Sequence, residues 1–290
     1  MKSLDPVSER REERHADIDL RSTVELVTLM NDEDAQVAEA VGHSAPELAT
    51  AIDAIVERLA GGGRLVYIGA GTSGRLAAVD AAECGPTFGL ADGTVVAIAD
   101  VEGEAEDDDA AGAAAIADAG VTGADAVVAL SASGSTPYTV SAARAAASAG
   151  ALTVAVVCVP DSELGRVSEL EVVAETGAEV IAGSTRLKAG TAQKLVLNTI
   201  STVSMIRLGR THGNLMVDVV ASNAKLLARA RRAVALATGV TDAAADDALA
   251  AADGNAKVAI LSLLAELPAA EARRRLDAAD GSIRRALEST

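Results

Sequence analysis

The chain of 290 residues carries 25 Lys and Arg against 42 Asp and Glu, a formal net charge of −17, and only 1% of it is aromatic. A negatively charged protein repels nucleic-acid phosphates, and so few aromatic rings offer little surface on which bases stack, which excludes nucleic-acid binding. For the same lack of rings, a bound sugar must be held by hydrogen bonds and charge. No apolar stretch reaches the length of a membrane span and the N-terminus does not resemble a signal peptide, so we expect a cytoplasmic protein with no membrane partner. Cys84 and Cys158 are too few and too far apart to predict a disulfide framework or a metal site.

Two periodic segments near the N-terminus predict a pair of helices. Residues 1–21 are charged and aperiodic, and we expect a mobile or partner-dependent arm there. Ser22 is followed three positions later by Glu25, the spacing of a capping box, at the start of an apolar periodic pattern. A second helical pattern covers residues 45–59 and is stopped by the glycines at 61–63.

Short apolar runs rich in β-branched residues follow. The continuous runs lie at 64–68, 94–99, 126–130 and 152–157, with shorter candidates at 171–174 and 179–181. Helical patterns, several of them rich in alanine, lie at 110–119, 138–149 and 191–208. This alternation of strands and helices predicts the α/β class, with a doubly wound parallel sheet sandwiched by helices.

The C-terminal part has a different pattern, which contains no strand run. Residues 249–255 align with residues 276–282, and both copies are helical with a glycine break. The repeat predicts a small module built from a duplicated helix–turn–helix. We therefore expect two domains, a catalytic domain with the N-terminal helices at 22–228 and the helical module at 229–290.

Two loops at predicted strand ends are suited to binding a phosphate. Residues 69–75 (GAGTSGR) follow the first strand, where Thr72 and Ser73 stand at the expected start of a helix. Free N–H groups at a helix N-terminus favour an anion. The glycine spacing is one residue short of a dinucleotide fingerprint, and a purely structural turn is the alternative.

The second loop, residues 131–137 (SASGSTP), follows another strand and supplies the hydroxyls of Ser131, Ser133, Ser135 and Thr136. Ligands of open α/β sheets bind outside the carboxyl ends of the strands, so the two loops are expected to face each other. No Gly-x-x-x-x-Gly-Lys-Ser/Thr motif of a nucleoside triphosphate site is present. The pair of loops predicts a site for the phosphate of a small monoester.

Carboxylates near the same strand ends are candidates for proton transfer. Glu83 lies beyond the first loop, close to Cys84 and Phe88, and the helix is expected to end near residues 85–86. These apolar neighbours are expected to desolvate the carboxyl group, which favours proton transfer near neutral pH. The acidic run 102–109 follows another strand, and although such a run is ordinarily a solvated turn, one of its carboxylates is a plausible partner of Glu83.

Seven segments and the duplicated tail, taken together, are similar to the N-acetylmuramic acid 6-phosphate etherase family, which is built on the sugar isomerase (SIS) fold. The segments are residues 16–19, 30–34, 69–75, 80–84, 86–89, 183–191 and 213–219. The resemblance implies a SIS-type sheet, a homodimer, and a lyase that acts on a sugar phosphate without a metal or an organic cofactor. In the implied reaction the C2 proton of the open-chain aldehyde is removed, the C3 ether leaves as D-lactate, and water adds at C3 to give N-acetylglucosamine 6-phosphate.

The resemblance also assigns roles to individual residues. Glu83 matches the acid that protonates the departing lactate, and Glu106 matches a second catalytic glutamate in the family's Glu-Gly-Ala-Glu-Asp-Asp motif, with Glu104 as the other alignment. The 6-phosphate is expected on the hydroxyl side chains of the two loops, namely Thr72, Ser73, Ser131, Ser133 and Thr136. Lys188 and Arg186 are candidates to supply positive charge.

The chain departs from the family pattern in two places. Gly85 stands where the family usually has proline, and residues 98–101 run directly into Glu102, where the family usually has a Gly-Gly-x-x-Ala stretch and a helical segment. The shortened segment favours, as alternatives, an aldose–ketose isomerase or a lyase that acts on another 6-phosphosugar. A non-catalytic sugar-phosphate sensor is a further alternative.

Overall fold

Five parallel strands form the central sheet in a computed structural model of the chain, which describes residues 10–218 and 224–288. The strands are β1 (Leu65–Ala70), β2 (Val95–Asp100), β3 (Ala126–Leu130), β4 (Leu152–Val157) and β5 (Leu170–Val173). Their order is β2-β1-β3-β4-β5, so the chain leaves β1 toward one edge, returns, and then builds toward the other. The predicted doubly wound parallel sheet is confirmed, and the switch point lies between the carboxyl ends of β1 and β3.

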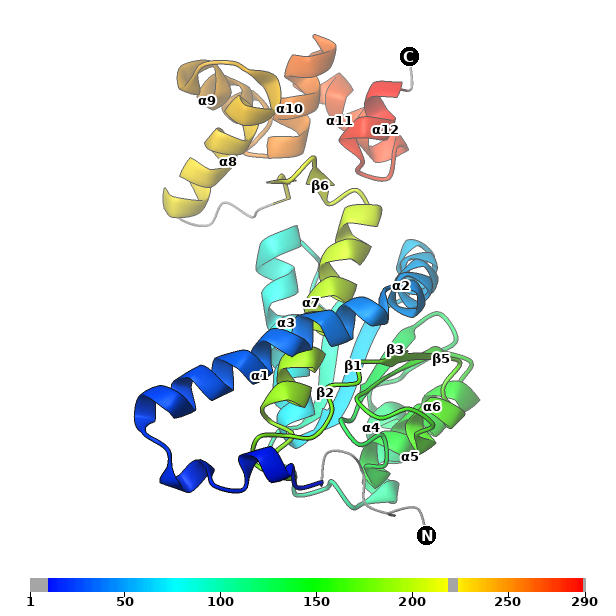
Figure 1. Ribbon diagram of the computed structural model, residues 1–290. Coiled ribbons are helices and arrows are strands. Elements are labelled where there is room, and N and C mark those ends of the chain that lie inside the picture. The colour runs from blue at the N-terminus through cyan, green and yellow to red at the C-terminus, as the bar shows by residue number, and fades with distance from the viewer. Residues whose placement is uncertain (1–9, 219–223, 289–290) are drawn as a thin grey trace. The chain divides into compact units, whose positions relative to one another are not determined.

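Helices cover both faces of this sheet. They are α1 (Thr23–His43), α2 (Ala45–Ala60), α3 (Gly71–Phe88), α4 (Asp109–Asp118), α5 (Pro137–Ser148), α6 (Glu163–Val167) and α7 (Lys188–Arg207). Figure 1 shows α4, α5 and α6 together on one side of the sheet, away from α2. The helix α3 contains Pro86 and continues to Phe88, so the predicted end near residues 85–86 is wrong. The amide of Gly89 still donates to the carbonyl of Gly85 and completes the last turn.

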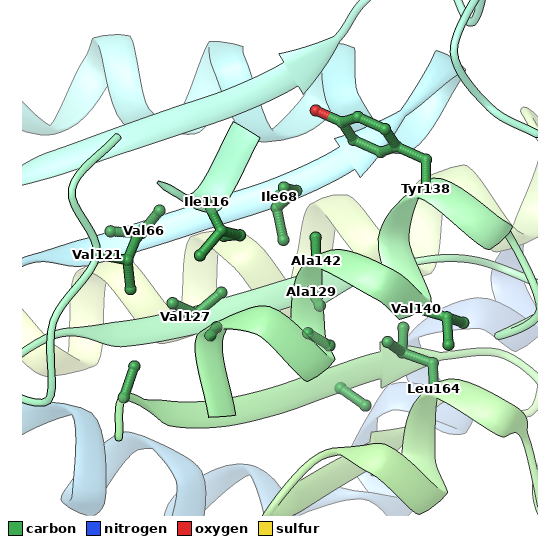
Figure 2. Packing of buried hydrophobic residues seen from close by; sticks show 14 of the residues in the cluster. Val66, Ile68, Ile116, Val121, Val127, Ala129, Tyr138, Val140, Ala142 and Leu164 are labelled. Carbon is green, nitrogen blue, oxygen red and sulfur yellow. The ribbon is translucent and has the colours of Figure 1, made fainter. Parts of the chain in front are cut away.

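Alternate side chains of the strands fill two cores. Val66 and Ile68 of β1 point toward α4 and α5, where they join Ile116 and Tyr138 in one buried cluster (Figure 2). Tyr67, between them, points to the opposite face, and its hydroxyl donates to Asp80 of α3 at 2.9 Å. Burial on both faces explains why the strands are continuous apolar runs in the sequence.

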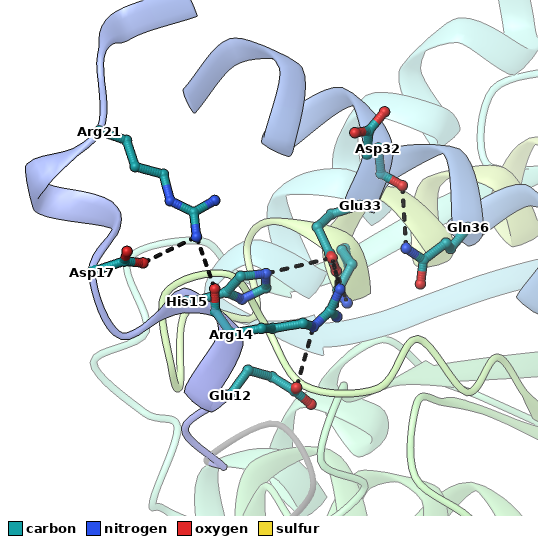
Figure 3. A network of polar contacts seen from close by, with 9 residues as sticks. Glu12, Arg14, His15, Asp17, Arg21, Asp32, Glu33 and Gln36 are labelled. Carbon is teal, nitrogen blue, oxygen red and sulfur yellow. Dashed lines mark hydrogen bonds and ion pairs between the residues drawn. The ribbon is translucent and has the colours of Figure 1, made fainter. Parts of the chain in front are cut away.

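Ion pairs and a capping box hold the N-terminal segment. Ser22 and Glu25 form the predicted capping box of α1. Before it, the short 3-10 helices η2 (Glu13–His15) and η3 (Ile18–Leu20) occupy part of the expected arm. Arg14 lies 2.6 Å from Glu33 of α1, and buried His15 lies 3.5 Å from the same carboxylate (Figure 3). Part of the segment expected to be a mobile or partner-dependent arm thus contacts α1 of the same chain, whereas residues 1–9 lie outside the described part of the chain.

The chain divides into two compact units, Met1–Ala82 with Gly93–Ser201 and Glu83–Asp92 with Thr202–Thr290. Within the described residues after Arg207, the second unit contains a two-stranded sheet and five helices. These elements are β6 (Thr211–His212), β7 (Leu215–Met216), α8 (Ala224–Thr238), α9 (Asp242–Ala251), α10 (Ala256–Ala265), α11 (Ala269–Ala278) and α12 (Ile283–Glu288).

The predicted repeat in this unit is confirmed by two matching turns. Gly254 donates to the carbonyl of Leu249 at 2.8 Å, and Gly281 donates to that of Leu276 at the same distance. Each glycine has a positive φ, of 78° and 74°, where a side chain would be strained.

Of the described helices, none alone is long and apolar enough to cross a membrane. The helices α9 and α10 meet that criterion only when they are taken together, and they are bent by 110° relative to each other.

Candidate active site

The first phosphate loop is a tight turn from β1 into α3. Gly71 begins α3 with a φ of 56°, a conformation that favours glycine. A Cβ on Gly74 would lie 2.5 Å from the carbonyl oxygen of Gly69, so the first turn of the helix packs directly on the end of the strand. Ser73 donates to Gln193 Oε1 of α7 at 2.9 Å, which fixes its side chain. The sharp turn brings Thr72 and Ser73 to the carboxyl end of β1.

The second loop joins β3 to α5 and is ordered by its own hydroxyls. Ser131 Oγ lies 2.9 Å from Thr136 Oγ1 and 3.4 Å from Ser133 Oγ, and it also accepts the amide of Gly134 at 3.0 Å. Gly134 has a φ of 65°, and a Cβ there would lie 2.4 Å from Ser162 Cβ. The loop therefore keeps its hydroxyls together at the carboxyl end of β3.

A cavity of about 480 Å³ brings the two loops together. Its lining residues are Ala70, Gly71, Thr72, Ser73, Arg75, Glu102, Gly103, Glu106, Ser131, Ala132, Ser133, Thr136, Gly183 and Thr185. All five hydroxyl residues predicted for the phosphate are among them, and so is Glu106. The cavity lies at the switch point of the sheet, where ligands of such folds bind.

The acidic loop between β2 and α4 contributes two carboxylates to this cavity. Glu102 and Glu106 line it and Glu104 does not, although all three residues are exposed in the chain. A Cβ built on Gly71 would lie 3.9 Å from Glu106 Oε2. The carboxylate of Glu106 is therefore close to the start of α3, beside the first phosphate loop.

Arg75 is the cationic side chain of this lining, and the sequence did not predict it as a site residue. Its Nη2 donates to Thr72 Oγ1 at 3.1 Å and its Nη1 donates to the carbonyl oxygen of Val101 at 2.6 Å. Because the guanidinium donates to Thr72, the hydroxyl hydrogen of Thr72 remains available to a ligand. The sequence did contain a signal for Arg75 as a site residue, because it lies one helical turn after the hydroxyl residues of the same loop.

Gly183 and Thr185 were also missed as cavity residues. They belong to the loop that connects β5 to α7, where the predicted strand at 179–181 does not form. Glu179 instead accepts the amides of Lys188 and Ala189, both at 3.0 Å, and so caps α7. The sequence signal that could have identified Gly183 and Thr185 as cavity residues is the run of small and hydroxyl residues directly before the helix α7.

Two cations proposed from the sequence do not reach the cavity. Lys188 is 2% exposed and its Nζ lies 2.9 Å from Glu33 Oε2, so its charge is used inside the protein. Arg186 is exposed and is not among the lining residues. The expectation that Lys188 supplies charge to the ligand is therefore wrong.

Glu83 differs from the other predicted site residues. It lies twelve positions after Gly71 on α3, and its side chain is exposed in the single chain. Cys84 and Phe88 are buried, but they lie one turn apart on a different face of the helix. The expected desolvation of Glu83 by these neighbours is therefore wrong for the chain by itself.

A second cavity of about 480 Å³ has a lining that does not suit an anion. Glu47, Glu171 and Glu175 line it together with Ala40, His43, Ser44 and Val173. Three carboxylates disfavour a second negative charge. Of these two cavities, the one at the ends of β1 and β3 therefore has the lining that suits an anion better.

The fold and the paired hydroxyl loops define a SIS-domain protein, and the SIS domain family model matches residues 31–158. In its fold the chain is similar to the solved structure of c3406 from E. coli CFT073, with a TM-score of 0.51 and 20% identity over 67% of this chain and 97% of that chain. At that identity the likeness concerns the fold alone.

Two relatives identify the family within this class. The chain is 55% identical over 289 residues to N-acetylmuramic acid 6-phosphate etherase of Rubrobacter xylanophilus, an alignment that covers 97% of this chain and 95% of the relative. It is 50% identical over 281 residues to the enzyme of the same name from Streptomyces avermitilis, with 94% and 90% covered. The chain belongs to the N-acetylmuramic acid 6-phosphate etherase family.

Proposed function

We propose that the chain is a lyase that cleaves the D-lactyl ether of N-acetylmuramic acid 6-phosphate and yields N-acetylglucosamine 6-phosphate and D-lactate. The observation that supports this most is the placement of Glu106 in one cavity with the hydroxyls of both phosphate loops. A site of this kind combines an anchor for the phosphate with a carboxylate for proton transfer. Membership in the etherase family supplies the substrate and the bond that is broken.

The phosphate anchor is built from hydroxyls and from backbone N–H groups. Thr72, Ser131, Ser133 and Thr136 provide the hydroxyls of the proposed anchor, and Ser73, whose own hydroxyl donates to Gln193, is proposed to contribute its backbone N–H in the first turn of α3. The N-terminal turns of α3 and α5 begin at these loops and add partial positive charge. Together with Arg75 these local donors offset the repulsion that a chain of net charge −17 exerts on an anionic sugar.

Glu106 is proposed as the base that removes the C2 proton of the open-chain aldehyde. That proton is acidic because it lies α to a carbonyl, so a carboxylate held in position suffices to take it. The C3–oxygen bond then breaks, its electron pair leaves with the lactate oxygen, and a double bond forms between C2 and C3. Addition of water at C3, with a proton returned to C2, restores the saturated sugar.

Glu83 is proposed as the acid that protonates the departing lactate, on the strength of the Ala-Ala-Glu-Cys motif that it shares with the family. An acid of this kind must be protonated at the moment of bond cleavage, which exposure to water disfavours. We therefore expect Glu83 to be covered in the assembled enzyme, although it is exposed in the single chain.

A homodimer is proposed for the assembled enzyme. An apolar patch at the start of α1 supports it: Leu20, Val24 and Val27 are 83%, 72% and 63% exposed. Exposure of three large apolar side chains within eight residues to water is unfavourable, and packing against a second copy of the chain would bury them. We expect Val24→Glu combined with Val27→Glu to yield monomers in light scattering, and a dimer that persists in this variant would contradict the assignment of the patch.

We also propose a cellular compartment and a division into domains. The cytoplasm is proposed because the chain has two cysteines, Cys84 and Cys158, both buried, which is too few for the disulfide framework that is typical of an oxidising compartment. The region 22–228 is proposed as the catalytic domain, because it contains every lining residue of the cavity, and 229–290 as an accessory helical module.

The deciding experiment incubates the purified chain with N-acetylmuramic acid 6-phosphate and measures D-lactate. Release by the wild type and its loss in Glu83→Gln are the expected results. In water enriched in ¹⁸O, the product is expected to carry the label at C3, because the ether oxygen leaves with lactate. Retention of the original oxygen would contradict elimination. Binding of the sugar phosphate without turnover would instead favour a sensor, and isomerisation of another 6-phosphosugar would favour the alternative enzyme.

A further inference from the structure

The shortened loop between β2 and α4 is held by the carboxylate of Asp100, the last residue of β2. Asp100 Oδ1 accepts the amide of Gly103 at 3.1 Å, and Oδ2 accepts the amide of Ala105 at 2.9 Å. Both oxygens of one carboxylate thus bind the backbone of the segment that leads to Glu106. Asp100 itself is fixed, because it pairs in register with Ala70 at the end of β1.

Arg75 holds the same loop from the side of α3. Its guanidinium donates to the carbonyl oxygen of Val101 at 2.6 Å and to Thr72 Oγ1 at 3.1 Å. One planar group therefore links a hydroxyl of the first phosphate loop to the first residue of the acidic loop. A planar fork that donates in two fixed directions suits such a link better than a flexible ammonium.

A third contact fixes the end of the loop. The backbone amide of Tyr138, in the first turn of α5, donates to the carbonyl oxygen of Glu106 at 3.1 Å. The loop is thus attached to β2, α3 and α5, the elements that surround the cavity.

These attachments determine where the Glu106 carboxylate lies. Its Oε2 is 3.9 Å from the position of a Cβ on Gly71 and 3.7 Å from that of a Cβ on Gly103. Gly103 has a φ of 77°, a conformation that favours glycine and that allows the loop to turn back after Asp100. Among the described contacts, the Glu106 side chain makes no hydrogen bond of its own. The backbone of the loop therefore determines that its carboxylate lies beside the first phosphate loop.

We propose that Asp100 and Arg75 are positioning residues that hold Glu106 against the phosphate loop. The inference rests on the proposed role of Glu106 in the etherase reaction. Asp100 acts on the backbone of the loop, and Arg75 couples that loop to the hydroxyl of Thr72. Neither residue exchanges a proton with the substrate in this proposal.

The physical reason is the sensitivity of proton transfer to geometry. A base must lie within hydrogen-bond reach of the proton that it removes, and a displacement of about 1 Å is able to cost on the order of 100-fold in rate. Seven residues separate Asp100, the end of β2, from Asp108, the N-cap of α4, and the contacts of Asp100, Arg75 and Tyr138 hold this segment. Loss of Asp100 allows Glu106 to move while the phosphate hydroxyls, which belong to other loops, remain. Loss of the Arg75 fork has the same effect on Glu106 and also removes a donor to Thr72.

The test compares Asp100→Ala, Asp100→Asn and Arg75→Lys with the full-length wild type, and uses Asp118→Ala as the control for an exposed carboxylate on α4. For Asp100→Ala we expect kcat for lactate release to fall roughly 10- to 100-fold, whereas KM changes by less than about threefold. Asp100→Asn keeps one acceptor oxygen and should lie between Ala and the wild type. Arg75→Lys keeps the charge but not the fork, so it too should lower kcat, and Asp118→Ala should match the wild type.

Hydrogen exchange provides a second measurement that does not depend on turnover. The amides of Gly103 and Ala105 should exchange slowly in the wild type and faster in Asp100→Ala, while those of the sheet remain protected. A kcat within about twofold of the wild type in Asp100→Ala, or exchange at residues 103–105 that equals the wild type, would overturn the proposal. If the wild type releases no lactate, the etherase assignment fails by itself, and the exchange of these amides alone decides whether Asp100 orders the loop.

Discussion

Lys188 and Glu33 form a buried ion pair that joins the first residue of α7 to the middle of α1, with 2.9 Å between Nζ and Oε2. The two side chains are 3% and 1% exposed. Arg14 and His15 approach the same carboxylate from the N-terminal segment (Figure 3). Because Glu179 binds the backbone of Lys188 as well, the pair anchors the loop that brings Gly183 and Thr185 to the cavity.

Removal of the ammonium from this pair should destabilise the fold. In Lys188→Met the carboxylate of Glu33 stays buried and retains only Arg14 and His15 among its described cationic neighbours, so we expect a loss of about 3 kcal/mol in the free energy of unfolding. Urea denaturation measures it. The exposed Lys194 on the same helix provides the control Lys194→Met, which should change little. An equal loss in both variants would contradict a specific role of the pair, and Glu33→Leu combined with Lys188→Met should recover part of the stability.

The acid limb of stability should depend on Asp125, which binds Arg64 at the amino ends of β1 and β3. Burial by itself raises the pKa of this carboxyl, but hydrogen bonds from Arg64 and Thr122 outweigh it and lower the pKa from 3.8 to about 2. A carboxyl with a lowered folded-state pKa contributes stability above the unfolded value, and this contribution is lost as the pH falls from about 3.8 through about 2.

The contribution of Asp125 is roughly 2 kcal/mol at neutral pH. Asp125→Asn should lower the free energy of unfolding at neutral pH and flatten its decline in acid, as measured by urea denaturation at several pH values. Asp118→Asn, an exposed carboxylate, is the control. Unchanged acid dependence in Asp125→Asn would show that other carboxyls dominate this limb.

The sheet was predictable because its strands are buried on both faces and appear as continuous apolar runs. The same holds for the capping box of α1, whose two partners, Ser22 and Glu25, are three residues apart. The false strand at 179–181 has an apolar run too short to distinguish from a loop, and the capping of α7 by Glu179 is a contact that periodicity does not reveal. Pro86 is tolerated in α3 because it removes only one hydrogen bond near the end of the helix.

Within the site, local motifs were informative and long-range pairs were not. The hydroxyl loops were predictable because each lies directly after a strand of one parallel sheet. The burial of Lys188 depends on Glu33, which lies 155 positions away in the chain. The exposure of Glu83 depends on which face of α3 it occupies, and its apolar sequence neighbours face elsewhere. The role of Asp100 depends on how a short loop folds back on the end of its own strand.

Glu106 and Glu104 are separated by a direct comparison. Glu106 is among the lining residues of the cavity and Glu104 is not, so Glu106→Gln should lower kcat by about 100- to 10,000-fold, the range for loss of a general base. KM should change little, because the phosphate hydroxyls are intact. Steady-state lactate release measures both constants. Glu104→Gln should retain kcat within about twofold, and the reverse pattern would assign the base to Glu104.

Ser131 is the hub of the second phosphate loop, since its Oγ contacts Ser133, Thr136 and the amide of Gly134. Ser131→Ala removes a donor to the phosphate and also loosens the other hydroxyls. A hydrogen bond to a charged group contributes about 1.5–3 kcal/mol, so we expect KM for the sugar phosphate to rise on the order of 10- to 100-fold. The value of kcat should stay within about threefold, because Glu106 belongs to a different loop.

Inhibition by inorganic phosphate should weaken in parallel with the rise in KM. The control variant Ser148→Ala, on the exposed end of α5, should leave kcat and KM unchanged. A fall in kcat at constant KM and constant inhibition by phosphate would place Ser131 in the chemistry and not in the anchor.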